Sequence, residues 1–100
     1  MASTSMHNDV HNWIGGDMRT GASPNDPVFF LHHANIDRMW HAWQEKYPLS
    51  PYVPLDMEPD ALLFHRYSDR MFTYFDETVA PKDVLDISSR YQYDTLADLY

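Results

Sequence analysis

The sequence contains no cysteine and few basic residues, and both shortages exclude classes of site and partner. Without cysteine, the chain can form neither a disulfide nor a thiolate metal site, although this fixes no redox compartment. Only seven lysines and arginines stand against fifteen aspartates and glutamates, which gives a net charge of −8, and the basic residues form no cluster. A nucleic-acid partner is therefore not expected.

Long apolar runs and targeting signals are also missing. No stretch reaches the roughly 18 apolar residues that a membrane span requires, so no membrane association is expected. Residues 1–5 lack the basic and apolar pattern of a secretion signal. We therefore expect a cytoplasmic location for the chain as expressed, while its natural compartment stays unknown. The abrupt start before the first histidine resembles a truncated or engineered start.

What the chain does contain is an unusual arrangement of histidines. His7 and His11 lie one helical turn apart, and such positions share one face of a helix, so both imidazoles can reach one ion. A third imidazole from another helix would complete a three-nitrogen set. Imidazole suits zinc, copper, iron or nickel, and three of them leave an open position for water, dioxygen or substrate. The spacing thus predicts a reactive metal site.

The residues between the two histidines bear on which metal is bound. In zinc hydrolases the motif His-Glu-x-x-His supplies a glutamate as general base. Here Asn8, Asp9 and Val10 occupy the gap. The hydrolase interpretation therefore loses its base, and the identity of the metal depends on the surrounding sequence.

Residues that typically begin and end helices predict two helices around these histidines. The hydroxyl residues at 3–5 can cap a short helix of about two turns that ends near Gly15 and Gly16. A loop over residues 20–25 follows. Asp26 as N-cap and Pro27 at the first helical position then begin a second helix, which runs to about residue 47.

The second helix carries a stripe at helical spacing that predicts a buried face: Phe29, Phe30, His33, Ile36, Asp37, Trp40 and Trp43. Trp13, on the first helix, is likewise expected in the core. Prolines at 48, 51 and 54 end the second helix. A third helix over residues 60–75 and extended segments at 84–87 and 91–93 are predicted beyond it.

Together, residues 6–18 and 23–40, with Asn25-Asp26-Pro27-Val28-Phe29 leading into the second histidine pair, resemble the CuB half of the tyrosinase superfamily of type-3 copper proteins. The short connection between them is most similar to bacterial tyrosinases, although plant catechol oxidases and molluscan haemocyanins share the pattern. Residues 48–100 are similar to the C-terminal part of the tyrosinase core, where a Tyr-x-Tyr pair closes the fold.

This resemblance implies the fold class and the domain organisation. The fold would be mainly α, a part of the type-3 copper four-helix bundle, namely the CuB helix pair, with an irregular C-terminal region. One hundred residues without a repeat make at most one small domain. We therefore expect a single CuB-type domain over residues 1–100, with a start at 1–5, the copper-binding helix pair at 6–47 and the C-terminal part at 48–100.

The resemblance also implies the ligands of one copper ion, which are His7, His11 and His33. Successive residues on a helix diverge by about 100°, so His32 and His33 cannot both point at one ion. The family pattern chooses His33 and makes His32 the neighbour. Asp37, one turn after His33, could accept its second N–H, or could pair with an arginine such as Arg38.

The CuA half that completes the site in this superfamily is missing. The other histidines, His32, His41 and His65, form no turn-spaced pair, and His41 and His65 are expected to be ordinary surface or partly buried residues. We expect one copper ion per chain, and a dicopper centre only if a CuA-containing partner chain or a second copy in a homodimer supplies the other ion.

Resemblance to tyrosinases implies oxidation of o-diphenols to o-quinones with dioxygen, as in melanin biosynthesis, with ortho-hydroxylation of monophenols as a further activity. Asn8 would be catalytic, because in tyrosinases an asparagine at this position helps to hold a water that deprotonates monophenols. The glutamate that shares this water lies outside this sequence, and Asn12 occupies a position that tunes monophenol against diphenol use. Two alternatives stay open: a haemocyanin-like oxygen carrier, and a copper-binding half-domain without catalysis.

Overall fold

A computed structural model describes residues 2–59, 64–72, 78–96 and 98 of the chain. Its contacts fall into two compact units, one formed by residues 1–48 with 95–100 and the other by residues 49–94. The described residues form helices and turns but no strand, which confirms the mainly α fold class. No helix in this described part of the chain combines the length and apolarity needed to cross a membrane.

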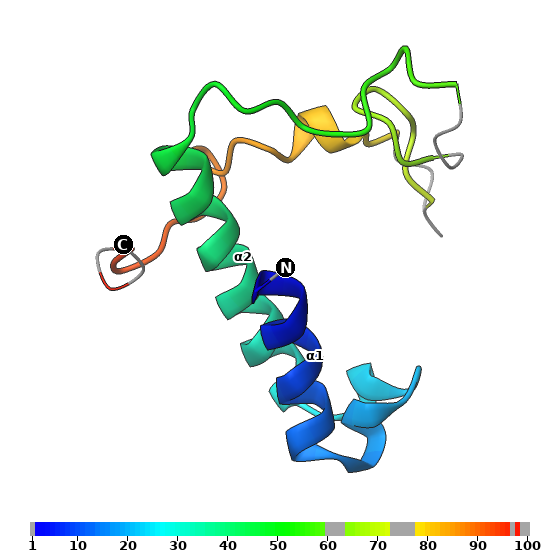
Figure 1. The fold of residues 1–100 in the computed structure, drawn as a ribbon, viewed down its shortest axis with the longest axis vertical. Helices are drawn as coiled ribbons and strands as arrows, with labels where there is room; N and C mark the ends of the chain where they lie inside the picture. Colours follow the sequence, from blue (N-terminus) through cyan, green and yellow to red (C-terminus); the bar gives the residue numbers. More distant parts are fainter. Residues whose placement is uncertain (1, 60–63, 73–77, 97, 99–100) are drawn as a thin grey trace. The chain divides into compact units, whose positions relative to one another are not determined.

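The first helix, α1, spans Ala2–Ile14 and is drawn in blue in Figure 1. It is longer than the sequence suggested, because the hydroxyl residues at 3–5 lie within the helix, and the prediction that they cap it is wrong. The predicted end is confirmed. Gly15 and Gly16 follow with φ of 72° and 56°, values that only glycine adopts without strain.

The glycine pair turns the chain back along α1. Two short 3-10 helices follow, η1 at Gly16–Arg19 and η2 at Ser23–Asn25. Thr20 joins them, since its hydroxyl donates to the Asp17 carbonyl at 3.0 Å and accepts the Ala22 N–H at 3.1 Å. Met18, on η1, is the most buried large side chain, at 1% exposure. The turn thus folds back as a compact element against the end of α1.

The second helix, α2, spans Val28–Lys46. Its start is close to the predicted one: the Asp26 carboxylate accepts the Val28 N–H at 3.0 Å, and Pro27 already has helical angles of −55° and −27°. The side chain of Asp26 therefore satisfies one of the free N–H groups at the helix start. At the other end, the Tyr47 N–H donates to the Trp43 carbonyl at 2.9 Å.

The predicted buried stripe of α2 is only partly buried. Phe30 is 62% exposed, and Trp40 and Trp43 are 39% and 38% exposed. Trp13, which the sequence placed in the core, is 85% exposed. A pair of helices can bury only the strip along which the two meet. The rest of an apolar face stays open unless a further layer covers it.

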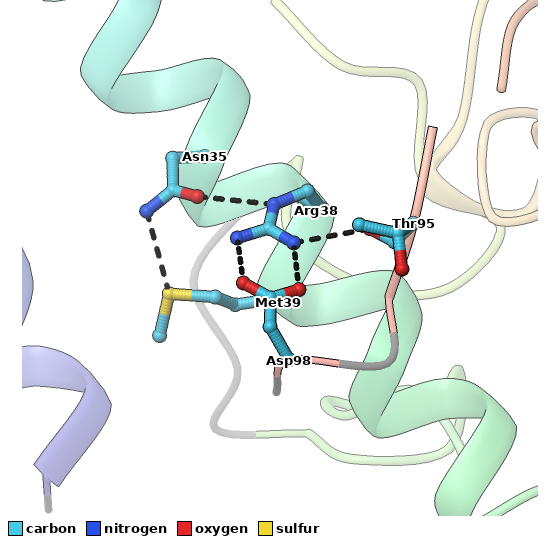
Figure 2. Close-up of polar contacts among 5 residues, drawn as sticks. All are labelled: Asn35, Arg38, Met39, Thr95 and Asp98. Carbon is cyan, nitrogen blue, oxygen red and sulfur yellow. Dashed lines mark hydrogen bonds and ion pairs between the residues drawn. The ribbon is translucent and has the colours of Figure 1, made fainter. Parts of the chain in front are cut away.

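Two residues near the C-terminus, Thr95 and Asp98, are bonded to α2 through Arg38. Figure 2 shows the Arg38 guanidinium donating to the Thr95 carbonyl at 3.0 Å and to both carboxylate oxygens of Asp98 at 2.7 and 3.1 Å. The Asn35 side chain accepts from Arg38 Nε at 3.1 Å. This forked geometry matches a carboxylate well and ties Thr95 and Asp98 to the histidine-bearing helix.

The second unit, residues 49–94, is held by scattered hydrogen bonds. Its one described helical element is η3 at Pro81–Asp83. Arg66 Nε donates to the Glu58 carbonyl at 2.8 Å, and the Met71 N–H donates to the Val79 carbonyl at 2.8 Å. The helix predicted over 60–75 does not form in its described part, 64–72, and the remainder lies outside the described residues. The segments predicted as extended form no strand where the structure describes them.

Candidate metal centre

Three imidazoles meet between α1 and α2. His7 and His11 lie one helical turn apart on α1, and His33 lies on α2. Figure 1 shows α2 running alongside α1. His11 Nε2 lies 3.2 Å from His7 Nε2 and 3.3 Å from His33 Nε2. The ring nitrogens of three side chains from two helices thus converge on one point.

These separations fit a shared metal ion. Two nitrogens bound to one ion at about 2.0–2.1 Å, with a tetrahedral angle between the bonds, lie about 3.3–3.4 Å apart. The measured spacings of 3.2 and 3.3 Å are close to that value. Three nitrogen donors with no carboxylate among them suit copper or zinc better than calcium or magnesium.

Hydrogen bonds made by the Nδ1 atoms of the two α1 histidines leave their Nε2 atoms unprotonated where the three rings converge. His11 Nδ1 lies 2.7 Å from the Met18 carbonyl oxygen, which can only accept, so Nδ1 carries the proton. His7 Nδ1 donates in the same way to the Asn8 side-chain oxygen at 2.9 Å. A neutral ring protonated at Nδ1 presents an unprotonated Nε2. Both rings are therefore prepared to bind a metal through Nε2.

His33 is oriented by an aromatic side chain instead. The ring of Phe29, one turn earlier on α2, stacks on it with a centroid distance of 4.1 Å and an interplanar angle of 26°. Burial lowers the pKa of His33, and positive charge on the neighbouring histidines His7, His32 and His11 lowers it further. The neutral, metal-binding form of His33 is therefore favoured.

His32 serves a different purpose from His33. Its Nε2 donates to the His7 carbonyl at 3.0 Å, and its ring stacks on that of His7 at 5.4 Å. A grouping of His7, His11 and His32 also brings one nitrogen of each within 4.8 Å of the others. A nitrogen that donates its proton to a carbonyl has no lone pair for a metal, so His32 could offer only its Nδ1. His33 instead places its Nε2 at 3.3 Å from His11 Nε2, which favours His33 as the ligand and His32 as the anchor of α1.

The remaining histidines lie elsewhere. His41 is buried at 8% exposure, with Nε2 3.5 Å from the Asp37 carboxylate, so the expectation of a surface or partly buried residue is wrong for it. His65 is exposed, as expected, in the second unit. Among the described residues, no group of histidines and carboxylates outside this cluster brings three ligand atoms close enough to share a metal ion.

An open pocket of about 410 Å³ gives access to the three imidazoles. Asn8 and Asn12 line it from α1, Arg19 and Thr20 from the turn, and Phe29 from α2. The structure thus places Asn8, predicted to be catalytic, both on the pocket wall and against His7. A ligand entering the pocket would meet the imidazoles at one end and polar groups of the turn around it.

Sequence reasoning did not identify three contributors to this site: the Met18 carbonyl, the Phe29 ring and Arg19. Phe29 could have been found, because it precedes His33 by one helical turn. The Met18 carbonyl could not, because its position depends on how the glycine turn folds back.

Comparison with known proteins identifies the relatives of this chain. Residues 1–46 match the model of the common central domain of tyrosinase. The chain is 46% identical to the tyrosinase of Streptomyces glaucescens over 91 residues, which are 91% of this chain and 31% of that protein. It is 44% identical to the tyrosinase of Streptomyces antibioticus over 90 residues, or 90% and 31% of the two chains.

A haemocyanin also matches: hemocyanin G-type, units Oda to Odg, of Enteroctopus dofleini is 37% identical over 110 residues, which cover 92% of this chain and 4% of that protein. The chain thus spans about a third of the length of the Streptomyces tyrosinases it matches. The histidine spacing, the converging imidazoles and these matches lead to one conclusion: the chain belongs to the tyrosinase family of copper proteins.

Proposed function

We propose that this chain binds one copper ion through His7, His11 and His33 and forms half of an oxidase centre for o-diphenols. The observation that carries the proposal is the convergence of three Nε2 atoms at 3.2 and 3.3 Å. Family membership supports copper as the metal. When bound, copper would supply the redox chemistry that passes electrons from a diphenol to dioxygen.

The reaction balances as two o-diphenols and one dioxygen giving two o-quinones and two waters. Each diphenol gives up two electrons and two protons. A single copper ion accepts one electron at a time, so the two-electron step requires a second ion. We propose that another chain or a second copy supplies it, either as a CuA-containing partner or in a symmetric homodimer.

The residues around the imidazoles would bind the substrate and help to remove its phenolic proton. The pocket is open enough to admit a phenol ring, and Phe29 offers an aromatic wall. Asn8 faces the pocket and holds His7 in the tautomer that binds metal. We propose that Asn8 also helps to hold the water that takes the phenolic proton, which would extend the activity to hydroxylation of monophenols.

Copper titration of the purified chain tests the proposal. We expect one copper per chain by isothermal titration, a doubling of mass by light scattering, and oxidation of catechol above that of free copper at equal concentration. A His33→Phe variant serves as control and should lose all three. A copper-loaded monomer whose catechol oxidation equals that of free copper would contradict the oxidase proposal.

Two other functions have support in particular observations. The haemocyanin match supports reversible oxygen binding, which predicts oxygen uptake without oxidation of catechol. The single metal-binding group of the described residues supports a copper-binding half-domain without catalysis. Copper binding with neither oxygen uptake nor turnover would identify that case.

A further inference from the structure

The metal pocket contains one permanent positive charge. Of the described residues that line it, Arg19 is the only lysine or arginine, while the others are histidine, asparagine, threonine, serine, methionine and phenylalanine. The whole chain carries a net charge of −8 and only seven basic residues. The pocket therefore carries a positive charge although the chain as a whole is negatively charged.

The position of Arg19 is set by the elements that build the metal site. It ends η1, directly after Met18, whose carbonyl accepts the Nδ1 proton of His11 at 2.7 Å. Its own guanidinium donates to the Asn12 carbonyl at 2.9 Å, and Asn12 directly follows His11. Both the backbone and the guanidinium of Arg19 are thus fixed to the segment that carries a proposed copper ligand.

Arg19 keeps most of its hydrogen-bonding capacity available. A guanidinium has five N–H donors, and the described structure shows one bond from it, to Asn12. No described carboxylate lies within ion-pair distance of Arg19, whereas Arg38 pairs with Asp98 and Arg66 with Asp69. The side chain is exposed, so an anion entering the pocket can reach it.

We propose that Arg19 is a specificity-determining residue that binds the anionic substituent of a phenolic substrate. The phenol hydroxyl would face the imidazoles, and a carboxylate on a short side chain across the ring would receive N–H groups from Arg19. A guanidinium suits a carboxylate because it can donate two parallel hydrogen bonds. The pocket then favours carboxylate-bearing phenols over neutral phenols. The inference rests on the proposed function, since it assumes that a phenol enters this pocket.

Binding to the zinc-loaded chain tests the inference without turnover, because zinc accepts imidazole ligands and has no redox chemistry. The probes are 3-(4-hydroxyphenyl)propanoate and 4-ethylphenol, titrated at pH 7 and followed by NMR chemical shifts. We expect the carboxylate to bind about two- to fivefold more tightly, as an exposed ion pair allows, and this preference to shrink as salt is added.

Three variants separate the charge of Arg19 from its structural contact. Arg19→Gln removes the charge and should abolish the preference. Arg19→Lys keeps the charge and should retain part of it, even if the contact to Asn12 is altered. Lys46→Gln removes a positive charge from the last turn of α2, outside the pocket lining, and should leave the preference at its wild-type value.

The inference is overturned if the wild-type chain shows no preference, or if Arg19→Gln keeps it. These outcomes are distinguishable from failure of the proposed function. A copper-loaded chain that oxidises catechol but does not discriminate between the probes refutes the role of Arg19 alone. A chain that discriminates between the probes but oxidises nothing supports Arg19 and refutes the oxidase.

Discussion

The same substitution at two adjacent histidines should have opposite consequences. His33→Phe removes a nitrogen that lies 3.3 Å from His11 Nε2, while a phenyl ring can keep the stack on Phe29. His32→Phe keeps the stack on His7 but removes the N–H that His32 donates to the His7 carbonyl. The pair thus compares loss of a ligand with loss of an anchor at nearly constant side-chain volume.

The magnitudes follow from these contacts. Removing a group that only supports a ligand costs about 10–100-fold in metal affinity, and loss of one of three ligands should exceed that range. We therefore expect His33→Phe to weaken copper binding by more than about 100-fold and His32→Phe by about tenfold. The lost hydrogen bond should cost the metal-free His32→Phe chain about 0.5–1.5 kcal/mol of unfolding free energy.

Copper affinity, measured by competition with a chelator, and urea unfolding of the metal-free chain give the two quantities. Circular dichroism confirms that each variant keeps its helices. If His32→Phe abolishes copper binding while His33→Phe preserves it, the alternative grouping of His7, His11 and His32 is the true ligand set. That result would refute the argument from hydrogen bonding.

Three further changes test the supporting contacts. Asn8→Ala removes the acceptor that holds His7 at 2.9 Å and should lower copper affinity about tenfold, whereas Asn8→Asp should restore it; chelator competition decides. Met18→Ala empties a position that is 1% exposed and should cost about 2–5 kcal/mol in urea unfolding, with unchanged stability contradicting its place in the core. The Arg38 guanidinium holds the pKa of the Asp98 carboxyl below its usual 3.8. A carboxyl with a lowered folded pKa contributes stability above its unfolded pKa and loses that contribution as the pH falls through the folded value. Asp98→Asn should therefore lower the melting temperature at pH 7, and the melting temperatures of variant and wild type should converge below pH 3.8.

The sequence predicted well those features that depend on local chemistry. The end of α1 at two glycines and the start of α2 at Asp26 and Pro27 follow from backbone and capping preferences. The meeting of His7 and His11 follows from the helical period. The place of His33 in the cluster was taken from family resemblance, because spacing alone could not choose between it and His32.

The sequence predicted poorly those features that depend on what covers a surface. Trp13 and Phe30 were both expected to be buried, yet both are more than half exposed. Hydrophobic spacing identifies a face suited to burial, but it does not show whether a neighbouring element is present. The reverse holds for His41, whose burial no local pattern indicated. The single-domain organisation over residues 1–100 stays a prediction.

Because few apolar side chains are buried, the imidazole cluster also matters for the stability of the fold. Among the described residues, Met18, Ala42 and Ala80 are the buried hydrophobic ones. Histidine rings meet between α1 and α2, where His7 and His11 contact His32 and His33. A metal ion bound by these rings would stabilise the packing of α1 against α2, much as zinc stabilises domains that fold only when zinc is bound. At a free copper concentration about a thousandfold above the dissociation constant, copper binding would stabilise the folded state by about 4 kcal/mol. The melting temperature of this chain should therefore rise with the concentration of free copper.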